Sequence, residues 1–338
     1  MRLKIHTFNL ELKNPFTISR GTRTHIPSLI VELIFNGKSG FGEATANPYY
    51  GTKIETLALE LESKREYVEI KPNLIPEKFW REMYSHFKDN MFLLCALDEA
   101  YYDLYTKLKE IKLYQYWNLK PSAIINSNYT IGIDTIPNMV AKMKAFENPI
   151  YKIKLGTEND VDIVKELRQH SDAIFRIDAN SAWSVSETLR NAIELQKLGV
   201  EFIEQPLPSD DWVGAKKVFE KSVLPVIADE SCIVEEDVEK CAAAFNGINI
   251  KLMKCGGLTP AKRMLDKANQ LGLKKMVGCM IESSVGISAI AHLTPLLDYV
   301  DMDGAILLNK DIASGITLEN GAIVFSEEFG TGAQLTVS

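Results

Sequence analysis

The amino-acid sequence predicts an α/β protein in which a modified TIM barrel, (β/α)7β, carries an α+β capping domain. Short apolar segments recur about every twenty-five residues through the second two-thirds of the chain. Amphipathic stretches with helical spacing lie between most of them, and this alternation indicates a parallel sheet. Nearly every apolar segment also ends in polar or charged side chains, as barrel strands do at the end that carries an active site.

Residues 1–120 have a different pattern and are expected to form the cap. LKIHTFNL and SLIVELIF predict early strands, NGKSGFGEA is interpreted as a glycine-rich turn, and FLLCALDEAYYDLYTKL predicts a helix. The final segment, 311–338, contains the strand-like ITLENGAIVF and is expected to return to the cap. Because no low-complexity segment or linker separates cap from barrel, the two are expected to pack closely.

Residues 121–310 are expected to form the barrel. Its eight predicted strands, in chain order, are INSNYTIGI, YKIKLG, IFRIDAN, FIEQP, VIADES, INIKLMK, MVGCMIES and YVDMD. Stretches such as VDIVKELRQH, SETLRNAIELQKLG and PAKRMLDKANQLG predict the helices between them. An open doubly wound sheet explains the alternation equally well, but not why so many strands end in charge. The last strand runs into DGAILLNKD without a clear helix, which indicates (β/α)7β.

Composition argues against several classes of protein. The chain has 338 residues, 46% of them hydrophobic, and a formal net charge of −7, so it can bury a large core but lacks the basic character of a nucleic-acid or anionic-membrane binder. Five scattered cysteines without a C-x-x-C pair indicate a reducing compartment. The N-terminal MRLKIHTFNLEL lacks the apolar core of a signal peptide, and no apolar run approaches the ~18 residues of a membrane helix. We therefore expect a cytoplasmic protein that binds neither nucleic acid nor membrane.

Three acidic residues, Asp178, Glu204 and Asp229, end the third, fourth and fifth predicted barrel strands. Carboxylates on neighbouring strands repel one another unless a cation lies between them. Oxygen ligands without histidine or cysteine favour a hard ion, Mg²⁺ before Mn²⁺. Each acid alone fits a helix N-cap or a surface residue equally well, but the three in series predict one Mg²⁺ per subunit.

Lysines end the second and sixth predicted strands, on opposite sides of an eight-strand ring. Lys154 and Lys251 would flank the acids, so that one removes the α-proton of a metal-bound carboxylate substrate and the other returns a proton from the opposite face. Because a free lysine is protonated at neutral pH, Lys152 is expected to lower the pKa of Lys154 by like-charge repulsion and to stabilise the enediolate. The alternative is an edge strand or a solvent-facing strand end, where lysines discourage aggregation.

Asp301 and Asp303 lie on one side of the eighth predicted strand, opposite the middle of the acidic arc. Two carboxylates that face the cavity far from the metal would suit a substrate ammonium group. The alternative is a loop turn before Gly304.

In order and spacing, the motifs KIK, DAN, EQP, ADES, NIKLMKCGG and DMDG resemble those of the enolase superfamily, in its muconate-lactonising subgroup. The similarity extends over nearly the whole chain and includes GFGEA and ALDEAYYDL in the cap. Enolase-type sites use a lysine or histidine base with Mg²⁺. Within the subgroup the chain most resembles dipeptide epimerases, L-Ala-D/L-Glu epimerases in particular, because DMD matches the motif that holds the α-ammonium of the dipeptide in that family.

The same resemblance implies further substrate-binding residues. PFTISRGTRT resembles the loop whose arginine pairs with the glutamate side chain of the substrate, which maps best to Arg23, with Arg20 as the alternative. Thr130 and Cys279 would line the substrate pocket, although a buried structural threonine and a small core cysteine fit these positions equally well.

Three more residues stand beside the predicted ligands and bases. By the resemblance, Asn180 and Glu230 would orient the metal ligands and Lys251. The role of Glu282, in GCMIES, stays open.

Together these features predict an isomerase, a Mg²⁺-dependent dipeptide epimerase that acts at the α-carbon of the C-terminal residue. The resemblance implies L-Ala-D/L-Glu from cell-wall (murein) peptides as its substrate. N-acylamino acid racemases, o-succinylbenzoate synthases and muconate cycloisomerases share the lysines and acids, but their substrates lack a free ammonium, so the aspartate pair favours a dipeptide. A non-catalytic barrel has no need of two opposed lysines. The sequence leaves open the N-terminal residue of the dipeptide and whether the chain forms a homo-oligomer.

Overall fold

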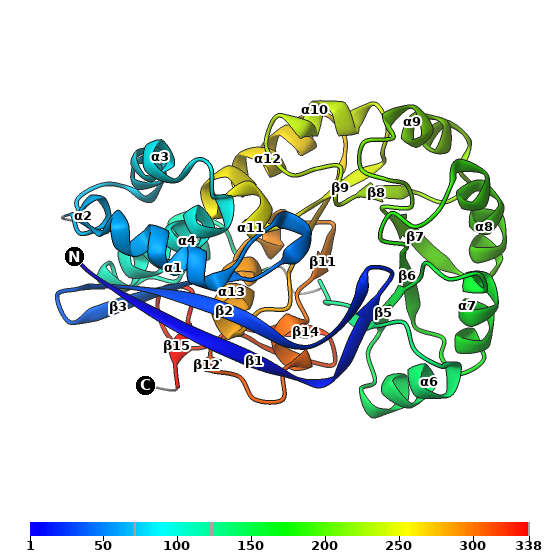
Figure 1. Ribbon diagram of the computed structural model, residues 1–338, viewed down its shortest axis with the longest axis horizontal. Helices are drawn as coiled ribbons and strands as arrows, with labels where there is room; N and C mark the ends of the chain where they lie inside the picture. The colour runs from blue at the N-terminus through cyan, green and yellow to red at the C-terminus, as the bar shows by residue number, and fades with distance from the viewer. Residues whose placement is uncertain (71, 122–124, 337–338) are drawn as a thin grey trace.

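A parallel barrel and a cap packed on one side of it make up the computed structural model, which describes residues 1–70, 72–121 and 125–336 (Figure 1). Eight parallel strands lie side by side in chain order, and each overlaps one of the eight predicted segments, although four of them begin one or two residues earlier. They are β4 (Tyr129–Ile131), β5 (Ile150–Lys154), β6 (Ile174–Asp178), β7 (Val200–Glu204), β8 (Val226–Ala228), β9 (Gly247–Ile250), β10 (Lys274–Gly278) and β11 (Tyr299–Asp301). The predicted barrel is thus confirmed. β5 lies between β4 and β6, so its lysines do not belong to an edge strand.

Helices follow the first seven strands and cover the outside of the barrel (Figure 1). They are α6 (Ile136–Ala145), α7 (Asp160–Arg168), α8 (Val185–Lys197), α9 (Trp212–Lys221), α10 (Asp237–Ala242), the single turn α11 (Leu252–Cys255), α12 (Leu258–Gln270) and α13 (Ser284–Ala291). Their apolar stripes explain their position: α8 buries Ala192 and Leu195 and begins with a capping box made by Ser184 and Glu187. After β11 the chain forms only the 3₁₀ turn η3 (Gly304–Leu307), as (β/α)7β requires.

The barrel is nearly closed. β4 and β11 share no hydrogen-bonded ladder in the described part of the chain. Side chains bridge the seam instead, because Ser127 Oγ accepts from the Met302 amide at 3.0 Å and Asn128 Nδ2 donates to Asp301 Oδ1 at 2.7 Å.

The N-terminal part of the chain forms an antiparallel sheet covered by helices. The strands are β1 (Arg2–Ile18), β2 (Gly21–Phe35) and β3 (Lys38–Thr45); they are followed by η1 (Pro48–Tyr50), α1 (Ile54–Ser63), α2 (Arg65–Val68), α3 (Pro76–Phe87), α4 (Met91–Leu108) and α5 (Leu113–Tyr116). The interpretation of NGKSGFGEA as a turn was wrong for most of its length. Only Asn36 and Gly37 turn, with φ of 49° and 74°, and the rest is β3. Gly40 and Gly42 are there because α4 lies so close that a Cβ atom would overlap its backbone.

The C-terminal segment packs back on the cap; its last two residues, 337–338, lie outside the described part. It contains β12 (Ala313–Ser314), β13 (Thr317–Glu319), β14 (Ala322–Val324) and β15 (Gln334–Leu335), and the turn η2 (Thr294–Leu296) precedes β11. Asp103 of α4 accepts from the Thr331 amide at 2.8 Å, and Lys107 donates to the carbonyl of Ala333 at 2.9 Å. Buried α4 therefore joins the two ends of the chain.

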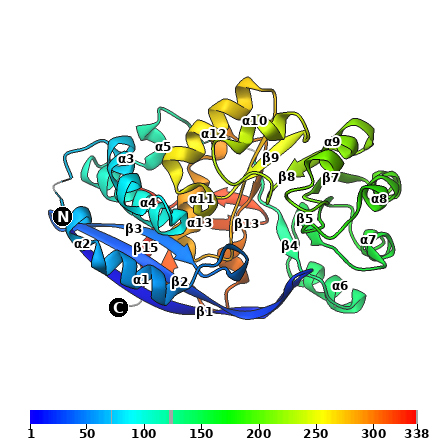
Figure 2. The ribbon, with the colours of Figure 1, turned by 45° about the horizontal axis from the view of Figure 1, so that its top comes forward.

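The hairpin between β1 and β2 reaches from the cap to the barrel (Figures 1 and 2). Near its tip the Thr17 carbonyl accepts from the Ile133 amide at 2.9 Å, just after β4. The hairpin thus overhangs the carboxyl ends of the barrel strands. None of the helices in the described residues has the length and apolar character needed to cross a membrane.

Candidate active site

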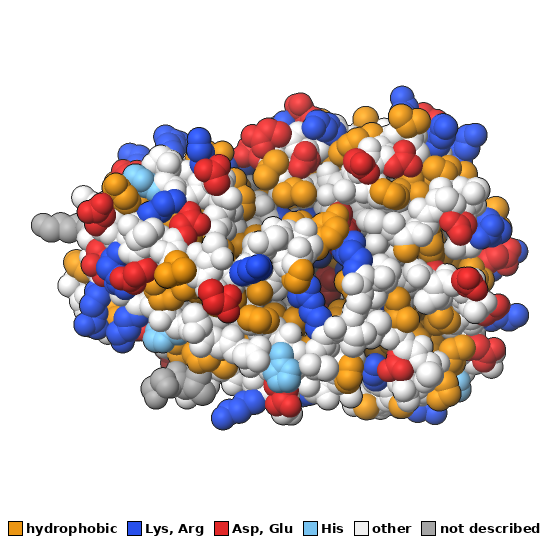
Figure 3. All heavy atoms as spheres, in the orientation of Figure 1, with side chains coloured by type: hydrophobic (Ala, Val, Ile, Leu, Met, Phe, Trp, Pro, Cys, Tyr) orange, Lys and Arg blue, Asp and Glu red, His pale blue; other side chains and the backbone are white. Residues whose placement is uncertain are grey.

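A cavity of about 470 Å³ lies between the β1–β2 hairpin and the carboxyl ends of the barrel strands. Figure 3 shows a hollow on this face of the molecule, with basic side chains around it and acidic ones within. Most of the residues predicted from the sequence line this cavity: Arg20, Arg23, Thr130, Lys152, Lys154, Asn180, Glu230, Lys251, Cys279, Asp301 and Asp303. The structure therefore brings together side chains that lie up to 283 residues apart in the sequence, from Arg20 to Asp303.

The acidic triad, Asp178, Glu204 and Asp229, lies beneath the cavity and is almost completely buried. Carboxylate oxygens of the three residues lie within 4.8 Å of one another. Their closeness follows from the strand register, which pairs Asp178 with Glu204 at the ends of β6 and β7. Directly after these ligands the backbone turns through left-handed conformations, with φ of 45° at Asn180 and 34° at Gln205, and so leaves the carboxylates at the strand ends.

The donor set of the triad fits Mg²⁺. All its ligand atoms are carboxylate oxygens, which a hard cation prefers. Asn249 Nδ2 donates to Glu204 Oε1 at 2.8 Å, but buried Glu204 Oε2 has no hydrogen-bond donor. Lys152 Nζ lies 2.8 Å from Oε2 as an ion-pair partner, at an angle that makes no hydrogen bond. An oxygen of this kind is available to a metal ion.

The electrostatics of the triad are uneven. Burial raises the pKa of Glu204 to about 7, with Lys152 opposing the shift. Burial also disfavours the charged form of Asp178, but Lys154 and Lys152 outweigh it and lower the pKa of that carboxyl. The pKa of Asp229 is likewise held well below its usual value by Lys251 and Lys254 against the effect of burial. The two outer acids are therefore charged, whereas burial, with the negative charges of Asp178 and Asp229, favours the neutral form of the central acid.

Lys154 and Lys251 each donate a hydrogen bond to one of the two outer acids of the triad, Asp178 and Asp229. Lys154 Nζ donates to Asp178 Oδ2 at 2.6 Å, and Lys251 Nζ donates to Asp229 Oδ2 at 2.7 Å. Both lysines also line the cavity, so they flank the triad on two sides of one space. Burial opposes the charged form of Lys251, but Asp229 raises its pKa overall, which favours the ammonium form that can deliver a proton.

Lys152 lies in the middle of the site, 1% exposed, among three carboxylates. Its Nζ is 3.1 Å from Asp178 Oδ2, 2.8 Å from Glu204 Oε2 and 2.8 Å from Asp301 Oδ2. Although burial opposes it, the acids, Asp301 first, raise the pKa of Lys152 well above its usual value. Lys152 is therefore a cation, as its expected role beside an enediolate requires. That it lowers the pKa of Lys154 stays a prediction.

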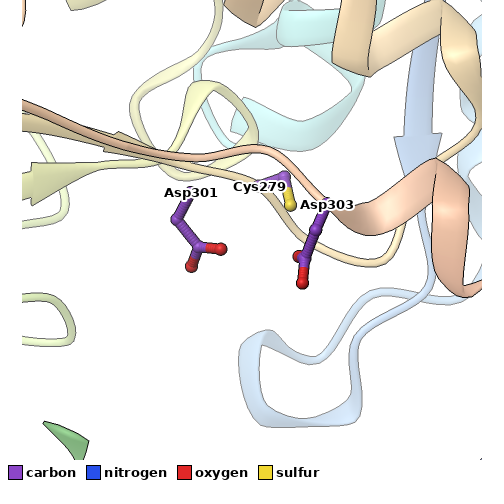
Figure 4. A group of neighbouring side chains, drawn as sticks. All are labelled: Cys279, Asp301 and Asp303. Atoms are coloured by element: carbon purple, nitrogen blue, oxygen red, sulfur yellow. The ribbon is translucent and has the colours of Figure 1, made fainter. Parts of the chain in front are cut away.

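Asp301 and Asp303 point to the same side of the chain, with the Cys279 thiol between them (Figure 4). Burial and then the charge of Asp301 raise the pKa of Asp303 to about 7, whereas Lys152 overcomes burial and lowers the pKa of Asp301. Burial and both aspartates raise the pKa of Cys279, which keeps its thiol neutral. The pair was expected to lie far from the metal ligands. Asp301 instead lies close to the triad, because the Lys152 ammonium pairs with both Asp301 and Asp178.

The two candidate arginines have different surroundings. Arg20 Nη2 contacts Glu230 Oε1 at 2.5 Å, and the Arg20 guanidinium lies 4.3 Å from the centre of the Tyr49 ring. Arg23 donates only to the Ala46 carbonyl, at 3.3 Å, among the contacts of the described residues. Burial, and then the charge of Arg20, lower the pKa of Arg23. This geometry favours Arg23 over Arg20 as the partner of a substrate carboxylate.

The remaining predicted residues lie around this centre. Thr130 pairs with Lys152 in the strand register and lines the cavity. The backbone N–H of Asn180 donates to Asp178 Oδ1 at 2.9 Å, whereas its side-chain Oδ1 is buried without a hydrogen-bond partner among the described residues, so an orienting role for the side chain stays a prediction. Glu230 was expected to orient Lys251, but the hydrogen bonds of the described residues join it to Arg20 instead. Glu282 is not among the lining residues; its Oε1 accepts from the Met280 amide at 2.6 Å.

Three polar residues of the site were missed in the sequence. Lys254, fully buried, donates to Asp229 Oδ1 at 2.6 Å, Asn249 donates to Glu204, and Asn128 donates to Asp301. Lys254 belongs to the quoted motif NIKLMKCGG, and its place three residues after Lys251 is the signal that it returns to the same strand end over one helical turn. Nothing in the local pattern distinguishes the two asparagines from ordinary loop or strand residues.

Known proteins share this architecture and sequence. The profile of the family described as Enolase C-terminal domain-like matches residues 138–337. The L-Ala-D/L-amino acid epimerase of Flavobacterium johnsoniae is 56% identical over 335 residues, which cover 99% of this chain and 100% of the relative.

Solved structures agree. The dipeptide epimerase of Cytophaga hutchinsonii, complexed with Mg and the dipeptide D-Ala-L-Val, superposes with a TM-score of 0.93 at 27% identity over 99% of this chain and 95% of the other. A substrate-liganded complex of the L-Ala-D/L-Glu epimerase from Bacillus subtilis gives 0.92 at 26% identity and covers 98% of each chain. Since the profile spans more than half of the chain and the first relative matches it from end to end, the chain belongs to the enolase C-terminal domain-like family, among the dipeptide epimerases of the enolase superfamily.

Proposed function

We propose that the protein is a Mg²⁺-dependent dipeptide epimerase that moves a proton on and off the α-carbon of the C-terminal residue. The observation that carries this proposal is the placement of Lys154 and Lys251. Each is bonded to a different outer acid of one buried triad, and both face the same cavity. Two amines on two sides of a substrate are what inversion of a carbon centre needs, because the proton leaves one face and returns to the other.

The residues divide the chemistry among them. Asp178, Glu204 and Asp229 would hold Mg²⁺, which when bound supplies positive charge for a substrate carboxylate. One of Lys154 and Lys251 accepts the α-proton at its Nζ, and the other donates a proton from its Nζ to the opposite face. The Lys152 ammonium adds a further fixed cation beside the developing enediolate.

The substrate is recognised at its two ends. The aspartates at the end of β11 suit an N-terminal ammonium, and this favours a dipeptide over the N-acylated or succinylated substrates of related racemases and synthases. Arg23, on the cap hairpin, suits the side-chain carboxylate of a C-terminal glutamate. We therefore propose L-Ala-D/L-Glu as the main substrate, within cytoplasmic metabolism of cell-wall peptides. Thr130 and Cys279 would line the pocket around it.

Deuterium exchange tests the function directly. The protein, loaded with Mg²⁺, is incubated in D₂O with L-Ala-L-Glu, and proton NMR follows the loss of the glutamate α-hydrogen and the appearance of L-Ala-D-Glu. We expect both, and we expect EDTA to stop them and added Mg²⁺ to restore them. A protein that exchanges N-succinyl amino acids but no free dipeptide has one of the alternative activities, and one that exchanges neither is not an epimerase of this kind.

A further inference from the structure

Asn249 is a fully buried polar residue that lies beside the metal ligands but does not line the cavity. It belongs to β9 and precedes Lys251 by two residues, so both side chains point to the same face of the chain, into the barrel. Its Nδ2 donates to Glu204 Oε1 at 2.8 Å. Because β8 lies between β9 and β7, this bond reaches across one whole strand inside the barrel and ties the central acid to the strand of Lys251.

The carboxamide oxygen of Asn249 has no comparable partner. Oδ1 is buried and accepts no hydrogen bond among the described residues. A buried oxygen without a donor destabilises the folded state, and an apolar residue at this position would avoid that cost. The reversed carboxamide would set Oδ1 against a carboxylate oxygen of Glu204, so Nδ2 is the atom that faces Glu204. The benefit of an asparagine here therefore lies in its bond to Glu204.

The barrel leaves room for this side chain at Gly278, the last residue of β10. A Cβ atom at Gly278 would lie 2.6 Å from Asn249 Oδ1 and 2.7 Å from Asn249 Nδ2, much closer than van der Waals contact allows. The backbone of Gly278 does not have a positive φ, so its conformation does not require glycine. The space that Asn249 fills is what requires it.

The bond from Asn249 leaves the second oxygen of Glu204 without a hydrogen-bond donor. This oxygen, Oε2, is buried, and Lys152 Nζ lies 2.8 Å from it as an ion-pair partner. The outer acids follow a similar pattern, because a donor that is not one of the lysines lining the cavity holds Oδ1 of Asp178 at 2.9 Å and Oδ1 of Asp229 at 2.6 Å. Each acid of the triad thus has one oxygen fixed from outside the cavity lysines and one oxygen next to such a lysine.

We propose that Asn249 is a positioning residue for the central metal ligand. It holds Oε1 of Glu204 and so leaves Oε2 for the divalent cation, and Gly278 provides the space that this arrangement needs. The inference rests on the proposed function, because it takes the triad as the Mg²⁺ site. It predicts that loss of the Asn249 bond weakens cation binding even without substrate, since a ligand that is no longer held must be ordered when the cation binds.

A double-mutant cycle of Asn249→Ala and Gly278→Ala tests the inference through cation binding rather than through turnover. Mn²⁺ is the probe, because it also prefers carboxylate ligands and the free ion is counted by electron paramagnetic resonance. The dissociation constant for Mn²⁺ is measured without substrate, and urea unfolding in EDTA measures the stability of the metal-free protein. Asn138→Ala is the matched control: this exposed asparagine of α6 also donates to a carboxylate, Asp134 Oδ1 at 2.9 Å, outside the cavity.

Asn249→Ala should raise the dissociation constant for Mn²⁺ roughly 10- to 100-fold, whereas the control should leave it unchanged. Gly278→Ala should raise it to a similar extent, because the new methyl group displaces the carboxamide, and the double variant should be no worse than Asn249→Ala. Stability should respond differently. Gly278→Ala should destabilise the otherwise wild-type protein but not Asn249→Ala, where the methyl group enters the space that the side chain has left. In the double variant, packing thus recovers while cation affinity stays low.

Unchanged Mn²⁺ affinity in Asn249→Ala would overturn the proposal. Recovery of both affinity and stability in the double variant would overturn it as well, because Asn249 would then only fill space. If Asn249→Ala shows no cooperative unfolding transition in EDTA, Asn249→Leu replaces it, since leucine keeps the branched shape without the donor. That variant should lose Mn²⁺ affinity to the same extent, and wild-type affinity would contradict the proposal.

The wild-type protein separates this inference from the proposed function. Binding of Mn²⁺ without α-hydrogen exchange of any dipeptide would refute the epimerase function, and the cycle would still decide the role of Asn249. Wild type that binds no Mn²⁺ would refute the metal site and the role of Asn249 together.

Discussion

The lysines of the site differ in their acidic partners and in whether they line the cavity, and these two properties indicate which of them can reach a substrate. Four lysines meet the acids of this site, but only three line the cavity: Lys152, Lys154 and Lys251. Lys254 is fully buried, and its Nζ contacts Asp229 and the Asn249 carbonyl. It therefore supports the Asp229 carboxylate rather than meeting substrate. Of the three, Lys154 and Lys251 each donate a hydrogen bond to an outer acid of the triad, and we propose these two as the acid–base pair.

Alanine substitution of either lysine tests this pair. In Lys154→Ala and in Lys251→Ala, epimerisation of L-Ala-L-Glu is expected to fall by roughly 10³-fold or more, because one face of the α-carbon loses its proton carrier. Each variant should still exchange the α-hydrogen of the isomer whose proton points to the remaining lysine, measured by NMR in D₂O with L-Ala-L-Glu and L-Ala-D-Glu separately. Lys165→Ala, exposed on α7, serves as the control. Undiminished epimerisation by either variant would exclude the two-base mechanism.

The two arginines of the cap hairpin give a second prediction at this scale. Arg23→Ala is expected to raise KM for L-Ala-L-Glu roughly 30-fold and to change KM for L-Ala-L-Ala less than threefold, because only the former carries a side-chain carboxylate. Arg20→Ala should impair both dipeptides to a similar extent, since Arg20 is bound to Glu230. Steady-state kinetics of the four combinations check this. Equal losses on both dipeptides in Arg23→Ala would remove Arg23 from substrate selection.

At the scale of elements, the strand ends of the barrel explain why so much of the site was predictable. The barrel strands are short apolar segments that recur at a nearly regular interval, so the last residue of each strand can be identified from the sequence. Asp178, Glu204 and Lys154 are the last residues of their strands, and the register of β5, β6 and β7 places them side by side. Local pattern and barrel topology together therefore determine the triad and its lysines.

Contacts between segments that are far apart in the sequence were not predictable in this way. Arg20 and Glu230 are 210 residues apart, and only the docking of the β1–β2 hairpin brings them together. The same holds for Asn128 and Asp301, which meet across the barrel seam and are 173 residues apart. Nor did the sequence show that GFGEA is a strand. The local sequence suggests a turn because glycine is common in turns. In GFGEA, however, the glycines are needed because α4 packs so closely on β3, and this tertiary contact cannot be inferred from the local sequence.

The contact between β3 and α4 supplies the prediction at this scale. In Gly42→Ala the new methyl group would overlap the Ala96 carbonyl of α4, so the cap must open or shift. We expect the free energy of unfolding to fall by roughly 3 kcal/mol, as for an overpacked core. Gly37→Ala, at a left-handed turn with open space around it, should cost only about 1 kcal/mol of backbone strain. Urea unfolding followed by circular dichroism measures both, and equal costs would show that helix proximity is not the reason for Gly42.

For the whole molecule, His292 connects parts of the chain that lie far apart in the sequence. It follows α13 of the barrel and is 1% exposed. Its Nδ1 accepts from the Tyr114 amide at 3.1 Å in the cap, and its Nε2 lies 3.1 Å from the Thr331 carbonyl in the C-terminal segment. The ring also stacks on Tyr114. This arrangement suits the neutral imidazole with its proton on Nε2, because a second proton on Nδ1 would face the Tyr114 N–H.

Acid should therefore weaken the junction of barrel, cap and tail through this one residue. Burial lowers the pKa of His292 from 6.5 to about 4, although the Thr331 carbonyl opposes the shift. Between pH 6.5 and pH 4, His292 is protonated in the unfolded chain and neutral in the folded chain. The contribution of His292 to the free energy of unfolding is therefore complete above pH 6.5 and is lost as the pH falls towards 4. Between pH 7.5 and 5 the loss amounts to about 2 kcal/mol.

His292→Gln isolates this contribution, since glutamine has a donor and an acceptor but does not titrate. The variant should be less stable than wild type at pH 7.5, and the difference should shrink by about 2 kcal/mol at pH 5, because only wild type must exclude a proton. Urea unfolding of both proteins at the two pH values measures this difference. The contributions of the other titrating groups are the same in both proteins and cancel in the comparison. They include buried carboxyls such as Asp98, whose pKa is raised by burial to about 8. If the difference between the two proteins is the same at both pH values, His292 does not carry the acid sensitivity of the junction.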